Sequence, residues 1–348
     1  MSKSNYKVAI VGASTLAGKE LNEALNESAL AAADFVLLDT DEAVGKLENV
    51  GDEVTFVRRM EADSFAGADF VFFAGTQEVT REHWQAAQRA GATVVDMSHA
   101  LETMPGVPVR APWVTELLGD GDAAGQPDLR TPAVVAAHPA AVMLATVLAQ
   151  LQAEYKVKSM AATVLEPASQ FGRAAMDELH QQTVTLLSFQ SMPKAMYDAQ
   201  AAFNVTPEMG AEAKVRLAAE EERIRRHYAT IAGNALPPLA MQLAHSATFH
   251  GVIASVLVEM EQPVSEESMA AALDGEHVDV LLDETEPPNN LSVAGQPNIQ
   301  VRVKPEPAGK PGMRYWLWMA ADNLKLASLN AIACGAELAR LRPQGKVQ

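Results

Sequence analysis

The chain has 348 residues, of which 27 are lysine or arginine and 44 are aspartate or glutamate, so its net charge is −17. This acidity disfavours nucleic acid as a partner, because a negative surface repels phosphate backbones. No run approaches the roughly 20 apolar residues that span a bilayer, and the first residues lead into a strand rather than a signal-peptide pattern. The single cysteine, Cys334, excludes an intrachain disulfide framework. We expect a cytoplasmic globular protein of about two domains.

The first part of the chain alternates predicted strands with predicted helices. The strands are expected at residues 7–14, 34–40, 69–75, 92–98 and 133–137. Helical spacing of apolar residues follows the first and the third of these strands. Continuous apolar strands that alternate with helices are typical of a doubly wound parallel sheet, so the sequence predicts a Rossmann-like α/β domain.

The pattern changes after about residue 150, where alternating strands and separate helices indicate an α+β domain with a mixed sheet. Strands are expected at residues 159–167, 247–261, 298–306 and 314–322. Helices are expected at residues 172–187, 211–231, 264–273 and from 323 onwards. The helix at 211–231 carries Glu/Arg pairs at i,i+4 spacing, which predicts a mostly solvated face.

The segment AVVAAHPAAVMLAT, residues 133–146, reads as a buried strand, a tight turn and the first turn of a helix. In an α/β enzyme, a turn of this kind is a common place for a nucleophile. Here the turn offers only His138, Ala140 and Ala141. A chain that is built like an enzyme therefore has nothing reactive at this point, unless the histidine acts as an acid or base.

Four strings lie in order along nearly the whole chain: VGASTLAGKEL, VVDMSHALETMPGVPVRAPWV, FGRAAMDEL and AADNLKLASLNAIACGAEL. Together they resemble motifs of the aspartate-semialdehyde dehydrogenase family. The resemblance implies a dinucleotide-binding domain, residues 1–139 completed by 321–348. It also implies a substrate and dimerisation domain, residues 140–320, and a homodimer.

The catalytic residues of that family are not found at the matching positions. Where the family has a cysteine in NPNCST, this chain has Ala141 in HPAAVM, and where it has a histidine after a glycine, this chain has Val252. The remaining acid/base candidates are His138 and His250. Cys334 lies in the predicted last helix, where a buried, inert thiol is expected.

A metal site is not expected. His245 and His250 are five residues apart, a spacing that on a strand places two side chains on opposite faces. No Cys or HExxH pattern supports zinc.

The substrate-binding residues implied by the resemblance are also replaced. The slot of the family's phosphate-binding arginine holds Glu102, and the slot of its substrate glutamine holds Glu166, followed by Ser169. A basic residue of the long helix could persist as Arg216 or Lys214. Two acidic replacements would repel a carboxylate substrate.

The resemblance implies NAD or NADP as cofactor, with binding residues spread over the first turn, the ends of the strands and the last helix. These residues are Gly12, Ser14, Thr15, Leu16, Gly18, Asp39, Gly75 and Asn323. Thr15 stands where a middle glycine lets phosphate approach the backbone. Glu42 occupies the arginine slot that favours the NADP 2′-phosphate, so NADP is disfavoured. Asp39 could bind a ribose hydroxyl, which suits NAD, but a solvated acidic turn is the simpler reading.

Two functions follow from these observations. The first is a homologue that has lost the dehydrogenase reaction and acts as a dimeric scaffold, as a regulatory partner of a paralogous or pathway protein, or as a binding protein, with no required cofactor. The second is an active NAD(P)-dependent semialdehyde dehydrogenase of amino-acid biosynthesis that works without a cysteine, with His138 or His250 as its acid/base.

Overall fold

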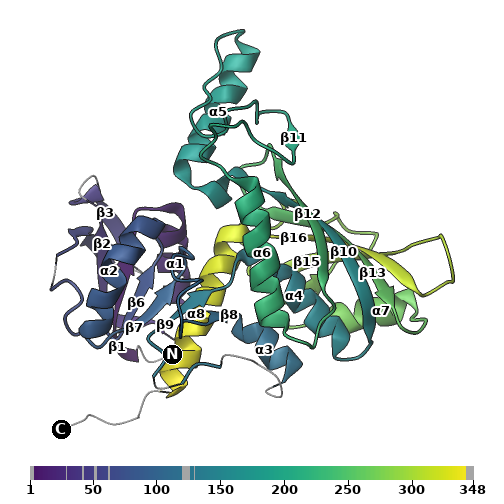
Figure 1. Cartoon of the computed structure of the whole chain (residues 1–348), viewed down its shortest axis with the longest axis horizontal. Helices are drawn as coiled ribbons and strands as arrows, with labels where there is room; N and C mark the ends of the chain where they lie inside the picture. Colours follow the sequence, from purple (N-terminus) through teal and green to yellow (C-terminus); the bar gives the residue numbers. More distant parts are fainter. Residues whose placement is uncertain are drawn as a thin grey trace. The chain divides into compact units, whose positions relative to one another are not determined.

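The computed structural model describes residues 4–28, 30–40, 43–50, 53–61, 63–119, 126–128 and 130–341 (Figure 1). The chain divides into two compact units. The first comprises residues 1–113, 123–137 and 327–348, and the second comprises residues 114–122 and 138–326. Among the described residues, no helix combines the length and the apolar character that crossing a bilayer requires.

The first unit contains a seven-stranded sheet in the order β5-β2-β1-β6-β7-β9-β8, and every neighbouring pair is parallel. Its strands are β1 (Ser4–Val11), β2 (Ala32–Asp39), β5 (Arg58–Arg59), β6 (Phe70–Phe73), β7 (Thr93–Asp96), β8 (Val109–Arg110) and β9 (Ala133–Ala136). Its helices are α1 (Leu16–Asn26), α2 (Gln77–Arg89) and most of α8 (Asn323–Leu341). All four residues of β6 are buried, as expected for a strand covered on both faces. The predicted doubly wound sheet is confirmed.

The second unit contains a mixed seven-stranded sheet in the order β11-β12-β10-β13-β16-β15-β14. Its strands are β10 (Val157–Glu166), β11 (Val205–Thr206), β12 (Leu239–Ser246), β13 (Val252–Met260), β14 (Val278–Val280), β15 (Ile299–Pro305) and β16 (Arg314–Ala321). The pairs β10–β12 and β14–β15 are parallel, and the other pairs are antiparallel. The mixed sheet is therefore confirmed as well.

The second unit also contains helices. They are α4 (Pro139–Gln152), the 3₁₀ helix η2 (Ala168–Phe171), α5 (Arg173–Leu187), α6 (Leu217–Ala232) and α7 (Glu266–Leu273), while α3 (Pro112–Leu118) lies across the division between the units. Helix α4 contacts β10 and helix α6 contacts β12, and the two helices also contact each other. Nearly all of α4 is buried, in keeping with its almost uniformly apolar sequence.

Two predicted boundaries in this unit are wrong. The helix expected at 211–231 begins at Leu217, because Lys214 N and Val215 N both donate to Met196 O and hold the preceding residues in a turn. The strand expected at 247–261 begins at Val252, after Gly251 at φ +86°. A Cβ on Gly251 would lie 2.9 Å from Asn290 Cα, so the chain turns here through a tight space.

Several elements were not predicted, most of them short. Strand β12 and the two-stranded sheet of β3 (Leu47–Val50) and β4 (Glu53–Phe56) have no counterpart among the expected strands. The long loop after α5 was also not assigned a structure, and two buried side chains of that helix fix it by hydrogen bonds. Glu178 accepts hydrogen bonds from Met196 N and Tyr197 N, and Gln182 bonds the backbone on both sides of Gln200.

Candidate functional site

The site lies in the second unit, where helix α4 begins. His138 is the N-cap residue of α4, and its Nδ1 accepts a hydrogen bond of 3.2 Å from Ala140 N. Because Nδ1 accepts, the proton of the neutral ring lies on Nε2. Pro139 follows at the first helical position, where no N–H is needed. Ala141, which was predicted at the family's thiol position, is completely buried in this turn.

Helix α6 supplies the partners of His138. Glu220 Oε1 lies 2.8 Å from His138 Nε2, and the Arg223 guanidinium pairs with the other carboxylate oxygen of Glu220. His227 Nδ1 accepts a 2.9 Å hydrogen bond from the backbone N–H of His138. Positions 220, 223 and 227 share one helix face, because residues three and four apart are neighbours on a helix. This face is buried, contrary to the expectation of a mostly solvated helix.

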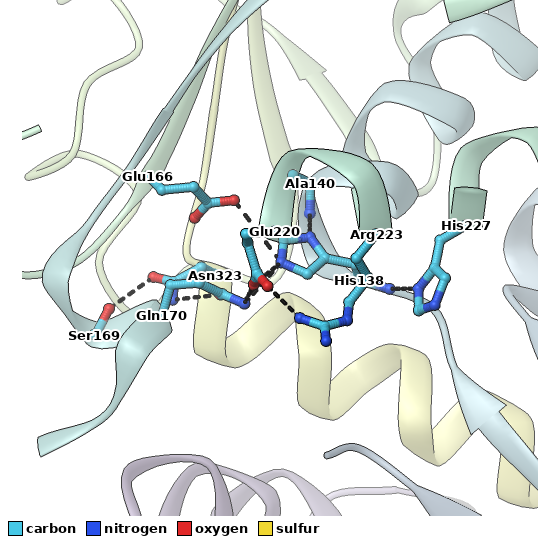
Figure 2. Close-up of polar contacts among 9 residues, drawn as sticks. All are labelled: His138, Ala140, Glu166, Ser169, Gln170, Glu220, Arg223, His227 and Asn323. Carbon is cyan, nitrogen blue, oxygen red and sulfur yellow. Dashed lines mark hydrogen bonds and ion pairs between the residues drawn. The ribbon is translucent and has the colours of Figure 1, made fainter. Parts of the chain in front are cut away.

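Glu166 enters the site from the end of β10 and is completely buried (Figure 2). Its Oε1 lies 3.9 Å from His138 Nε2, and neither carboxyl oxygen has a hydrogen-bond partner among the described residues. Burial raises the pKa of Glu166 to about 7, an effect that His138 opposes and Glu220 reinforces. An unpaired buried polar group of this kind costs about 1–3 kcal/mol of stability.

Side chains around the start of α8 close the site. Asn323 Oδ1 accepts hydrogen bonds from Ser169 Oγ at 3.1 Å and from Gly251 N at 3.2 Å. The Gln170 side-chain amide lies 3.1 Å from Glu220 Oε1 and 2.8 Å from His138 Nε2 (Figure 2). Asn323 and Ser169, predicted as cofactor and substrate residues, thus bond each other beside the buried histidine.

The other histidines have different surroundings. Val252, in the family's histidine slot, is the first residue of β13 and is buried. His250 lies in the connection before it and not on a strand, so the reasoning about its facing within a strand does not apply. His245 is fully buried on β12, its ring nitrogens have no hydrogen-bond partner among the described residues, and burial lowers its pKa to about 4. No cluster of metal-binding side chains occurs among those residues.

The predicted nucleotide turn lies in the first unit. A Cβ on Gly12 would lie 2.5 Å from Gly75 Cα, and a Cβ on Gly18 would lie 2.1 Å from Gly12 O. Thr15 caps helix α1, which begins at Leu16, and its Oγ1 accepts the N–H of Gly18. The glycines are therefore needed for backbone packing, and one N–H at the helix start is already satisfied by Thr15.

The carboxylate of Asp39 is already hydrogen-bonded to the protein beside the same turn. Its Oδ2 accepts hydrogen bonds from the backbone and hydroxyl of Ser14, and its Oδ1 accepts one from Thr40 N. A ribose hydroxyl would have to share these oxygens with the protein. Glu42, predicted to disfavour NADP, lies outside the described residues.

The remaining candidates do not join the buried cluster. Arg216 is the exposed N-cap residue of α6 and Lys214 precedes it, so neither lies on the helix as predicted. Cys334 is buried on α8 in the first unit, as expected, and burial raises the pKa of its thiol. Glu102 also belongs to the first unit.

Sequence reasoning missed Gln170, Glu220, Arg223 and His227. The one available signal was the spacing of Glu220, Arg223 and His227, which places three polar residues on one helix face. A polar stripe normally faces solvent, so burial could not be deduced from it.

The assembled groups can bind and exchange protons, but they offer no activated nucleophile. A carboxyl that titrates near neutrality beside an imidazole is suited to acid–base chemistry. Covalent attack on a carbonyl needs a thiolate or its equivalent. The described residues of the second unit include no cysteine, and Ser169 is bonded to Asn323.

Comparisons with known proteins agree with this architecture. A model of the semialdehyde dehydrogenase NAD-binding domain matches residues 7–118, and a model of the semialdehyde dehydrogenase dimerisation domain matches residues 148–326. A USG-1 protein homolog of Pseudomonas aeruginosa is 30% identical over 331 residues, 94% of this chain and 96% of that protein. An aspartate-semialdehyde dehydrogenase of Rickettsia bellii is 25% identical over 96% of this chain and 97% of its own.

Among solved structures, a probable aspartate-semialdehyde dehydrogenase from Pseudomonas aeruginosa superposes with a TM-score of 0.82 at 27% identity, covering 97% of this chain and 99% of that one. The matched models together cover most of the sequence, in the order in which the two units occur. The chain belongs to the semialdehyde dehydrogenase family.

Proposed function

We propose that this protein binds a small molecule at the His138 site and does not carry out the semialdehyde dehydrogenase reaction. The observation that carries the proposal is the Ala141 methyl group, buried at the start of α4, where the resemblance requires a thiol. A methyl group has no lone pair with which to attack an aldehyde carbon. The position of the second catalytic group is filled by Val252, which cannot accept a proton.

The charges of the site support the same proposal. His138 is bonded on both ring nitrogens, and Glu220 is engaged by His138 and Arg223. Glu166 adds a second carboxyl group within 3.9 Å of the histidine. A carboxylate or phosphate substrate would meet two acidic side chains here. The site is therefore better suited to a ligand that is not anionic.

A dinucleotide has few free groups to bind at the first turn. The resemblance places its phosphates against the start of α1, where Thr15 and Asp39 already accept the N–H groups of Gly18 and Ser14. The carboxylate of Asp39 would also repel the 2′-phosphate of NADP. We therefore propose that NADP is not a cofactor of this chain and that the remaining choice is between NAD and none.

A direct assay tests the loss of activity. Purified wild-type protein and the A141C variant are incubated with aspartate semialdehyde, phosphate and NADP or NAD, and reduced cofactor is followed by absorbance. We expect no turnover by wild type and none by A141C, because the thiol alone lacks a base at Val252. NADP at millimolar concentration is expected to leave the thermal unfolding midpoint unchanged.

The control is A145C, which adds a thiol one helical turn further along α4, at another buried alanine. Turnover by the wild-type protein in the range of ordinary dehydrogenases, about 1–10³ s⁻¹, would support the active enzyme instead. In that case Glu166 and His138 would be the groups to test as acid and base.

We also propose that the protein is a homodimer that pairs through the open face of the second sheet. The matched dimerisation domain covers this sheet. Ala161, Leu257 and Trp316 lie side by side across β10, β13 and β16, and Trp316 is 40% exposed. Apolar side chains on an open sheet face are suited to association with a second copy.

The L257R variant tests the interface, because it places an unpaired charge at the centre of this face. Sedimentation equilibrium is expected to show a wild-type dimer and at least about tenfold weaker association for L257R. The control E82R changes the charge of an exposed side chain on α2. Equal association of wild type and L257R would place the interface elsewhere.

A further inference from the structure

The buried carboxyl group of Glu166 accepts no hydrogen bond from the part of the chain that the structure describes, and its nearest charged neighbour is His138 Nε2, at 3.9 Å. Its side chain is completely buried, and neither oxygen is hydrogen-bonded among the described residues. Other buried acids of this unit are satisfied: Glu178 accepts two backbone N–H groups, and Glu220 is bonded to His138 and Arg223. A buried carboxyl group that is left unpaired points to a partner that the protein chain does not itself supply.

His245 lies beside Glu166 and is in the same condition. The two residues are register partners on the parallel strands β10 and β12, so their side chains emerge on the same face of the sheet. Neither ring nitrogen of His245 has a hydrogen-bond partner within the described ranges, and the side chain is completely buried. Its ring packs against Tyr197, with centroids 5.0 Å apart, and Phe171, at 6.0 Å. Two unpaired polar groups and two aromatic rings thus meet at one place.

The charges around Glu166 determine what kind of partner fits. The titratable groups that face it are His138 from α4, Glu220 from α6 and His245 from β12. Burial favours neutral His245, and the imidazole of His138, which lowers the pKa of Glu166, lies closer to Glu220, at 2.8 Å against 3.9 Å. The nearby guanidinium, Arg223, is paired with Glu220. His138 and Arg223 therefore both engage Glu220 more closely than Glu166, whose carboxylate can attract a cation.

We propose that Glu166 anchors a binding site for a small organic cation, with a primary ammonium or guanidinium group that donates hydrogen bonds to its carboxylate and to His245. The rings of Tyr197 and Phe171 add a favourable aromatic environment for such a cation. The inference rests on the proposed function, since it takes this site to be a binding site and names the class of its ligand.

Carboxyl ¹³C NMR of protein labelled at glutamate tests the site directly. Methylammonium chloride or guanidinium chloride is added at millimolar concentrations, with sodium chloride as the ionic-strength control, and the Glu166 resonance is assigned by its loss in E166Q. Without a ligand, Glu166 should titrate at about pH 7. With either cation, its midpoint is expected to fall by about one pH unit, since a paired carboxylate holds its charge more readily. Cation affinity should therefore rise about threefold from pH 6 to pH 7.

Three comparisons make the result decisive. E178Q, which changes a satisfied buried glutamate, should retain the cation-dependent change at Glu166, whereas E166Q should no longer bind the cation by calorimetry. Sodium acetate and sodium phosphate should have no effect. The proposal is overturned if the Glu166 titration is the same in both cations as in sodium chloride, or if an anion produces the change. If E166Q does not fold, the wild-type glutamate resonance whose midpoint lies at about pH 7 identifies Glu166, and its response to the two cations decides.

The two proposals can fail separately. Turnover of a semialdehyde by the wild-type protein would remove the proposed function, whatever methylammonium does. Absence of both turnover and a cation effect would leave the proposed function in place and remove only the cation site.

Discussion

Replacement of Glu220 with leucine is expected to lower the free energy of unfolding by about 3–5 kcal/mol, because it breaks a buried ionic network and leaves its partners unpaired. Glu220 is bonded to His138 at 2.8 Å, to Gln170 at 3.1 Å and to Arg223, and it is only 7% exposed. Leucine fills much of the same volume but accepts no hydrogen bond. Equilibrium unfolding in urea measures the difference.

The matched control is E222L, two residues along the same helix. The Glu222 side chain is 78% exposed, and its ion pair with Arg226 is 3.8 Å long, so the change should stay within about 0.5 kcal/mol of wild type. Equal losses in the two variants would mean that helix α6 responds to any loss of charge. The buried network would then have no special role in stability.

The second large effect concerns pH and Glu166. The folded chain holds the Glu166 proton with a pKa of about 7, above the ordinary value of 4.5. Protonation therefore stabilises the fold fully below about pH 4.5, and this contribution is lost as the pH rises through 7. Between pH 5 and pH 8, wild type should lose about 2–3 kcal/mol relative to E166Q, whose amide does not titrate.

Urea unfolding of both proteins at several pH values measures this difference. E178Q is the control, because Glu178 is also buried but already accepts two backbone hydrogen bonds, and it should follow the wild-type dependence on pH. Parallel pH profiles of wild type and E166Q would show that Glu166 remains ionised in the folded protein. The electrostatic argument for a cationic ligand would then be stronger, but the linkage argument would be wrong.

Much of the fold could be predicted from the sequence, because continuous apolar strands and helical spacing report burial directly. The parallel sheet of the first unit, the mixed sheet of the second and the start of α4 after β9 were all predicted. The late start of α6 at Leu217 could not be, since it depends on bonds from Lys214 and Val215 to the distant Met196 carbonyl. Local spacing carries no information about such long-range contacts.

The site was harder to predict than the fold. Ala141, Glu166 and Val252 were assigned to the site from a family resemblance. The resemblance shows which catalytic residues are missing, but it does not show which other side chains surround the site. Glu220 and His227 were overlooked because charged residues on a helix normally face solvent, and only tertiary packing shows that they are buried. Likewise, predicting that His245 lies beside Glu166 requires the register of β10 and β12, and β12 was not predicted.

The contact between Gly12 and Gly75 affects how such chains are classified. Only glycine at position 12 lets the end of β1 come this close to the backbone of Gly75, because any Cβ there would clash. A protein that binds no nucleotide would need the same glycine for this close backbone contact. A sequence search that scores the glycine pattern therefore detects the backbone packing of the fold. It will assign binding proteins, scaffold proteins and enzymes to the same family.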